Sequence, residues 1–305
     1  MDELAPEITS AEDTSKKIRN VAHLILGIGA IILPFFVIPN PAFSLQISKG
    51  LLITISTLLA LAVYLVSLIQ EGGFRFPKNL FSSSVLFIGI SAVVSAVLSG
   101  QGVMSYFGYG LEVGSAVFIG VSCIAFFLAS QLYQDHKQTL RLYVGFLVSF
   151  YALALYQIIK IVSGGTALSF GFLSGTTANL IGNFNDFGVF VALILFGSLL
   201  ALELMALKPL MKVVAYVTLA LSVLLLAIVN FSTLWIVIAA FSLLFFLYMY
   251  MGGGRSYNEA EERVSRARTI SWKALSVCVV AIAVSYTHLR AHETKANLVC
   301  RLLLE

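Results

Sequence analysis

The chain has 305 residues, of which 59% are hydrophobic and only 11% are charged, and its formal net charge is +4. Soluble domains carry about 25% charged residues, so this chain has too few charges to cover a water-facing surface. The composition excludes an ordinary soluble globular domain and favours a protein built from membrane-spanning segments.

Eight apolar runs are long enough to cross a bilayer, and a ninth begins near the end of the chain. A transmembrane helix needs about 20 apolar residues. We predict spans at 20–39, 50–69, 80–99, 113–132, 142–162, 187–207, 213–229 and 235–251, with the ninth starting at Ala274. Strands of a membrane barrel alternate apolar and polar residues, whereas these runs are apolar throughout. The sequence therefore predicts an all-α, polytopic transmembrane helical bundle.

Positive charge is concentrated in every second loop, and Lys and Arg gather on the cytoplasmic side of membrane proteins. The basic positions precede the first span and follow the second, fourth, sixth and eighth: Lys16, Lys17, Arg19, Arg75, Lys78, Lys137, Arg141, Lys208, Lys212, Arg255, Arg263, Arg266, Arg268 and Lys273. The other loops contain only Lys49, with Lys160 near the outer end of the fifth span. We therefore predict a cytoplasmic N-terminus.

The basic stretch 255–273 does not predict a nucleic-acid partner, because Glu259, Glu261 and Glu262 are interleaved with its arginines and it lies between spans. Trp235 and Trp272 lie near predicted membrane interfaces, where tryptophan anchors helices.

The two ends of the chain differ from the 18–283 transmembrane domain. Residues 1–17 are acidic and polar, and we expect them to be disordered. Residues 284–305 resemble the translated read-through of a sequencing adapter, which would leave His288, His292 and Cys300 without function; the alternative is a short amphipathic tail. The ninth span has only ten residues, 274–283, before this segment begins. Ten residues make about half of a membrane crossing. We therefore interpret the ninth span as truncated, and the chain as the N-terminal part of a larger protein.

No Walker pattern, metal-ligand spacing or Ser/His/Asp set is present, so we predict neither a metal nor a cofactor. Gly27 and Gly29, and the Gly110-x-x-x-Gly114 pattern, indicate close helix packing. Glu203, in the inner half of the sixth span, fits a carboxylate reaching towards Lys208 and Lys212.

Candidate binding residues gather in the predicted outer loops. Lys160 shares a helix face with Tyr156; it either extends outward to the interface or meets an anionic lipid head group. The loop 163–186 ends with Asn183, Asn185 and Asp186, which either cap the next helix or bind a sugar arriving from outside. The segment 100–112, which contains Glu112, fits a short re-entrant or interfacial turn. Lys49 and Glu112 complete the candidate set.

The chain resembles the O-antigen ligase and polymerase family of bacterial envelope enzymes over about residues 18–283. The resemblance is carried by Asn183-Phe-Asn-Asp-Phe-Gly188 at the start of a long span, by Phe43-Ser-Leu-Gln-Ile-Ser-Lys49 after the first span, and by the helix spacing. It implies a GT-C-like membrane glycosyltransferase in the bacterial cytoplasmic (inner) membrane. It also implies metal-independent transfer of a polyprenyl-diphosphate-linked glycan to a sugar acceptor at the outer face.

Such a transfer needs cations that stabilise the diphosphate leaving group and a base for the acceptor hydroxyl. The resemblance implies that Arg and His residues of a large loop beyond these spans supply them. We therefore expect the catalytic residues to lie outside this sequence and the chain to be inactive alone. The alternatives are a multi-pass transporter or flippase of lipid-linked glycan, which uses polar groups at mid-membrane, and a structural subunit of an envelope complex.

Overall fold

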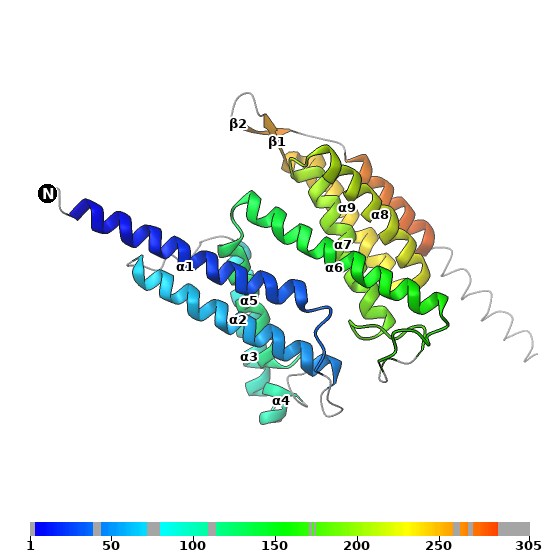
Figure 1. The fold of residues 1–305 in the computed structure, drawn as a ribbon, viewed down its shortest axis with the longest axis horizontal. Helices are drawn as coiled ribbons and strands as arrows, with labels where there is room; N and C mark the ends of the chain where they lie inside the picture. Colours follow the sequence, from blue (N-terminus) through cyan, green and yellow to red (C-terminus); the bar gives the residue numbers. More distant parts are fainter. Residues whose placement is uncertain are drawn as a thin grey trace, which may run out of the picture. The chain divides into compact units, whose positions relative to one another are not determined.

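The computed structural model describes residues 4–38, 44–71, 80–108, 114–170, 173, 175–258, 263–267 and 271–285. The chain divides into two compact units. The first contains residues 1–153 and 180–182, and the second contains residues 154–179 and 183–305. Helix α6 belongs to both, because the division falls inside it. Figure 1 shows the elements of each unit in sequence colours.

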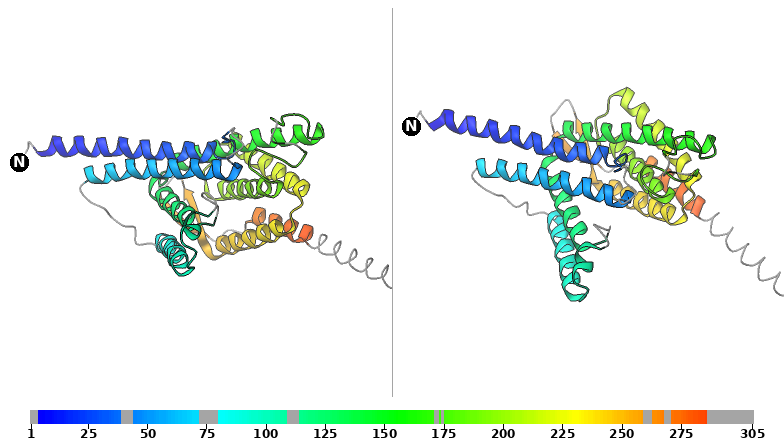
Figure 2. Two further views of the ribbon diagram at one scale, coloured as in Figure 1. Left: turned by 90° about the horizontal axis from the view of Figure 1, so that it is seen from below. Right: turned by 60° about the horizontal axis from the view of Figure 1, so that its bottom comes forward.

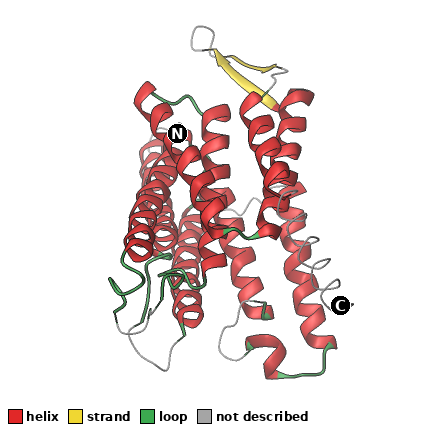
Figure 3. Cartoon of the chain, turned by 90° about the vertical axis from the view of Figure 1, so that its right-hand side faces the viewer, coloured by secondary structure: helices red, strands yellow, loops and turns green. Residues whose placement is uncertain are grey.

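A helix lies at each of the nine predicted spans in the described part of the chain. The long helices are α1 (Leu4–Ile32), α2 (Leu45–Gln70), α3 (Leu80–Leu98), α5 (Ala116–Leu132), α6 (His136–Val162), α7 (Phe184–Leu204), α8 (Pro209–Val229) and α9 (Ser232–Tyr248). A further helix covers Trp272–Ser285. Short elements are α4 (Val103–Phe107), a π-helical turn η1 (Met249–Gly253) and the antiparallel hairpin β1 (Gly254–Asn258) and β2 (Arg263–Ala267), shown in yellow in Figure 3.

Six of these helices are long and apolar enough to cross a membrane, namely α2, α3, α6, α7, α8 and α9. Their burial pattern is the reverse of that in a soluble protein. Large apolar side chains such as Phe87 and Leu98 are exposed, whereas small polar ones such as Thr57 and Ser222 are fully buried. Lipid accepts exposed apolar side chains, and helices in lipid pack through small residues. The predicted helical class is therefore confirmed, with the architecture of a multi-pass membrane protein.

Three helices fall short of a full crossing. The apolar part of α1 starts after Arg19, and the helix ends at Ile32, before Pro34. Helix α5 has 17 residues, which at about 1.5 Å per residue gives about 26 Å, against roughly 30 Å of hydrocarbon. The helix Trp272–Ser285 is shorter still. It includes the first two residues of the predicted adapter segment, and residues 286–305 lie outside the described part.

The N-terminal segment is helical in the structure. Residues 1–17 were expected to be disordered, but α1 already begins at Leu4. Extending an existing helix avoids the unfavourable nucleation step. Ser15 also fixes this stretch, since its Oγ donates to the carbonyl of Ser67 at 3.2 Å and to Glu71 Oε1 at 2.6 Å.

The first unit has its core where α1, α2 and α5 meet, and α1 and α2 run side by side in both views of Figure 2. Buried Ala22, Leu26, Ala60, Tyr64, Leu128 and Leu132 form this core. Just beyond α5, the Tyr133 hydroxyl donates to the carbonyl of His23 at 3.0 Å. Burial raises the pKa of Tyr133 to about 12, so the hydroxyl remains a donor.

The glycines of α1 permit this close approach, as predicted for Gly27 and Gly29. A Cβ at Gly29 would lie 2.7 Å from Cβ of Ser56 on α2, and one at Gly27 would lie 2.5 Å from the Tyr133 hydroxyl. At Gly114 a Cβ would meet no described atom within 4 Å, so the packing interpretation finds no support there. Gly110 lies outside the described residues.

Replacing Gly29 by leucine is expected to separate α1 from α2. A larger side chain cannot fit against Ser56 without moving one helix, and overpacking of this kind costs about 1–3 kcal/mol. The measurement is the thermal unfolding midpoint of the detergent-solubilised chain. Gly120→Leu, at a glycine of α5 with open space around it, serves as the control and should unfold like the wild type. Equal midpoints for both variants would contradict the packing account.

In the second unit, α7 packs against α8 and α9. Gly188 allows α7 to approach closely, since a Cβ there would lie 2.9 Å from Val229 and 3.2 Å from Leu234. Trp235 is 2% exposed, so it is a core residue and the predicted interfacial role is wrong for it. Trp272 is exposed, which remains compatible with an anchor.

Glu203 has a partner that the sequence did not indicate. Its Oε1 accepts from Lys273 Nζ and from Ser271 Oγ, both at 2.9 Å. Ser271 also caps the last helix, because its Oγ accepts from the backbone N–H of Ala274 at 3.2 Å. Glu203 therefore ties the end of α7 to the start of the helix Trp272–Ser285, rather than pairing with Lys208 or Lys212.

Candidate functional site

The last turns of α6 carry three polar side chains on adjacent positions of the helix surface: Tyr156, Gln157 and Lys160. Each donates to a different backbone carbonyl of the loop that follows. Tyr156 Oη reaches Leu168 O at 3.0 Å, Gln157 Nε2 reaches Thr176 O at 2.8 Å and Lys160 Nζ reaches Leu173 O at 2.5 Å. The loop is thus held against the helix at three points along its length.

The loop also closes on itself near its beginning. Helix α6 ends at Val162 and is followed by Gly164 and Gly165, which have positive φ angles. The N–H of Gly165 donates to the carbonyl of Lys160 at 2.8 Å. A Cβ at Gly165 would lie 2.6 Å from the carbonyl carbon of Gly175. Because backbone faces backbone there, only glycine fits, and the two arms of the loop are drawn together.

Two bulky residues of this loop have left-handed backbones: Leu168 at φ 55° and Phe170 at φ 47°. A left-handed backbone costs roughly 1–2 kcal/mol for a residue with a Cβ. The carbonyl of Leu168 is the one that Tyr156 holds. The surrounding contacts therefore maintain a conformation that an isolated loop would avoid.

Lys160 is fully buried, and its Nζ lies 5.8 Å from the centre of the Tyr156 ring. In the described part of the chain no carboxylate pairs with it. Neither of the two roles expected from the sequence, extension towards solvent or contact with a lipid head group, matches this position. Its ammonium group is used to hold the loop.

The loop leads into α7, whose first turn carries the other predicted residues. The Asp186 carboxylate accepts from the backbone N–H of Asn183 at 3.0 Å, the carboxylate half of a capping box. The buried side chain of Asn179 donates to the carbonyl of Asn183 at 3.1 Å. The side chains of Asn183, Asn185 and Asp186 are exposed. The capping role is therefore present, and polar groups remain accessible at the start of the helix.

Lys49 has a structural role in the first unit. Its Nζ donates to the carbonyls of Leu33 and Pro34 at 3.0 and 2.9 Å. These carbonyls follow the end of α1, where a positive charge is favoured by the helix dipole. Glu112 lies outside the described residues; the segment predicted as a re-entrant or interfacial turn contains the short helix α4.

Gln157 is the residue of the second unit that the candidate set missed. It is fully buried, and its Oε1 has no hydrogen-bond partner among the described residues. An amide within an apolar span was the signal available in the sequence. Gln157 lies next to Tyr156 and one helical turn before Lys160. The three side chains therefore form one polar face of α6 that is directed at the loop.

The chain matches no family model, no curated protein and no solved structure.

Proposed function

We propose that the chain contributes the glycan-binding surface of an O-antigen ligase or polymerase-like transferase, which acts on a polyprenyl-diphosphate-linked glycan at the outer face of a bacterial cytoplasmic membrane. One observation carries this proposal: the loop 163–183 is held in a strained form by three side chains of α6 and leads directly to exposed Asn183, Asn185 and Asp186. Strained backbone clusters at ligand sites.

The side-chain chemistry at the start of α7 suits a sugar. An asparagine amide both donates and accepts hydrogen bonds, which matches hydroxyl groups, and the free N–H groups of a helix start favour an anion. Asn185 takes no part in the capping contact of Asp186 with Asn183. We assign Asn185 to hydroxyl recognition and Asp186 to holding the first turn in place.

The proposed orientation follows from charge. Helix α7 begins at the loop and ends shortly before Lys208 and Lys212, so its start lies on the side opposite these lysines. With the basic loops inside, the N-terminus is cytoplasmic and the loop 163–183 faces outward. In this arrangement α1 and α5 also pass through the membrane although α5 and the apolar part of α1 are shorter than the hydrocarbon layer, which a locally thinner bilayer accommodates, giving eight spans before the last helix.

In the proposed reaction the acceptor hydroxyl oxygen attacks the anomeric carbon of the donor sugar. A new C–O bond forms, the bond to the diphosphate breaks, the hydroxyl proton passes to a base, and polyprenyl diphosphate leaves. No described residue is assigned as that base. The residues named here would position the glycan, which affects transfer through binding and orientation.

Asn185→Ala is the variant that tests the role of this surface, expressed from the intact gene in its host. It should reduce glycan transfer about tenfold, since a lost hydrogen bond to a substrate is worth roughly 1–1.5 kcal/mol, while the membrane level stays unchanged. Asn230→Gly, in the turn after α8, is the control, because glycine fits the left-handed backbone of this position. Transfer is measured as glycan attached to its acceptor.

Three outcomes bear on the proposal. Reduced transfer in Asn185→Ala alone supports it. Normal transfer in this variant means that the polar residues at the start of α7 only cap the helix and do not bind the glycan. Loss of glycan export, with unattached lipid-linked glycan accumulating on the inner side after gene deletion, indicates the flippase alternative and overturns the transferase proposal.

A further inference from the structure

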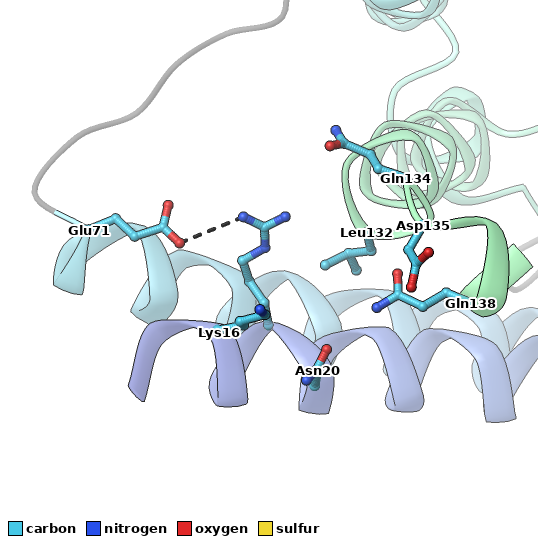
Figure 4. A pocket seen from close by; sticks show the side chains of 8 residues that line it. Lys16, Asn20, Glu71, Leu132, Gln134, Asp135 and Gln138 are labelled. Carbon is cyan, nitrogen blue, oxygen red and sulfur yellow. Dashed lines mark ion pairs between the residues drawn. The ribbon is translucent and has the colours of Figure 1, made fainter. Parts of the chain in front are cut away.

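A polar cavity of about 270 Å³ opens in the first unit, at the end of the helices where the predicted basic loops lie. Residues from α1, from the end of α2 and from the α5–α6 connection line it, and Figure 4 shows their side chains around one space. They include Lys16, Arg19, Asn20, Glu71, Asp135 and Gln138. Because a water molecule takes about 30 Å³, the cavity accommodates a small polar group.

Two of the four charges are already paired. Arg19 Nη1 lies 3.7 Å from Glu71 Oε1, an atom that also accepts from Ser15 Oγ at 2.6 Å. This pair is drawn as the dashed line in Figure 4. It leaves the ammonium of Lys16, on α1, and the carboxylate of Asp135, beside the start of α6.

These two remaining charges line the same cavity without pairing. Lys16 makes no ion pair with any described residue. Asp135 Oδ1 accepts from the backbone N–H of Lys137 at 3.2 Å, and its second oxygen accepts from no described residue. Opposite charges that share a cavity but do not meet leave room for a ligand that carries both signs.

The composition of the cavity selects among ligands. Two cationic and two anionic side chains give it no net charge, so a purely anionic group would be repelled by Asp135 as much as it is attracted by Lys16. A zwitterion satisfies both. The amides of Asn20 and Gln138 add donors for phosphate oxygens, and the carboxylate favours an amine that carries N–H donors over a trimethylated one.

The position indicates the source of such a ligand. Buried Leu132 borders the cavity, and it is the last residue of an apolar helix, so the site lies where hydrocarbon gives way to head groups. We propose that this cavity binds the phosphate–ammonium head group of phosphatidylethanolamine, with the phosphate at Lys16 and the amine at Asp135. The inference is independent of the proposed transferase function.

The test uses the full chain in nanodiscs of mixed phospholipids, followed by native mass spectrometry of the lipids that remain bound after release. The wild type should retain phosphatidylethanolamine about tenfold more than phosphatidylcholine or phosphatidylglycerol. Asp135→Asn keeps the acceptor for the Lys137 N–H and removes the charge, so it should abolish the preference over phosphatidylcholine. Lys16→Gln should lower retention of phosphatidylethanolamine. Lys137→Gln, an exposed lysine outside the cavity, is the control and should behave like the wild type.

A second arm separates the lipid from a soluble ligand of the same chemistry. Phosphoethanolamine is added to the detergent-solubilised chain at millimolar concentration, and displacement of the retained lipid in the wild type supports the proposal. Binding of soluble phosphoethanolamine without retention of the lipid overturns the lipid assignment. Equal retention of the three lipids, or retention unchanged in both Asp135→Asn and Lys16→Gln, overturns the site itself.

Discussion

Replacing Lys160 by methionine is expected to release the loop 163–183 while leaving the helices of the second unit folded. The variant loses the bond from Nζ to the carbonyl of Leu173, and a hydrogen bond from a charged group contributes about 1.5–3 kcal/mol. Amide hydrogen exchange in peptides covering the loop should therefore accelerate at least tenfold, since 1.4 kcal/mol corresponds to a factor of ten.

The global stability of the same variant should change little or rise. Lys160 is fully buried without a described carboxylate, and desolvating an ammonium group is costly. Methionine has a similar length and carries no charge, so it removes that cost along with the bond. Local loosening without global destabilisation distinguishes a loop-holding lysine from one that supports the core.

Lys137→Met provides the matched control, because Lys137 lies on the same helix and is exposed. It should leave exchange in the loop unchanged. If Lys160→Met exchanges at the wild-type rate, the contact with Leu173 does not hold the loop, and an outward-reaching side chain becomes the better account. If the loop supports glycan transfer as proposed, Lys160→Met should also lower transfer at an unchanged membrane level.

The second large effect is expected at Glu203. Glu203→Ala removes the acceptor shared by Lys273 and Ser271, and so detaches the start of the last helix from α7. The side chains of Glu203 and Lys273 are 13% and 32% exposed, so the pair is shielded more than a surface ion pair worth about 0.2–1 kcal/mol. We expect a local loss of about 1–2 kcal/mol, taking charged hydrogen bonds as the guide.

Cys278 reports this loss, because it is 4% exposed in the last helix and its Sγ lies 3.5 Å from the carbonyl of Ala239. In a Cys300→Ser background in detergent, maleimide labelling of Cys278 should accelerate about tenfold in Glu203→Ala. Labelling of Cys123, on α5, should not change. If labelling of Cys278 accelerates in Lys208→Ala but not in Glu203→Ala, the result supports the pairing of Glu203 with Lys208 that the sequence suggested.

The positions of the helices were predictable because lipid imposes a simple condition. Every backbone N–H and C=O within hydrocarbon must be bonded inside the chain, so an apolar run of sufficient length becomes a helix wherever it occurs. The ends of the helices were less predictable. Pro34 and the polar start of α1 shifted that helix towards the N-terminus, and the acidic tail became helical because it continues a helix and Ser15 meets Ser67 and Glu71.

The candidate site was predictable in its location but not in its contacts. The spacing of Tyr156 and Lys160 showed that they share a helix face, and the asparagines before α7 showed a cap or a polar surface. Which carbonyl each side chain reaches depends on the path of a loop that contains left-handed residues and a close approach at Gly165. Neighbouring positions in the sequence carry little information about such a path.

The sequence by itself determined the membrane class, the helical positions, the alternation of basic and non-basic loops and the polar character of the loop before α7. These follow from composition, run length and charge, which are local properties. Only the tertiary structure decided that Lys160 holds a loop, that Lys49 caps α1, that Glu203 meets Lys273 and that Lys16 and Asp135 share a cavity. Each of these contacts joins residues distant in the chain or separated by a loop, and their meeting depends on how whole helices pack.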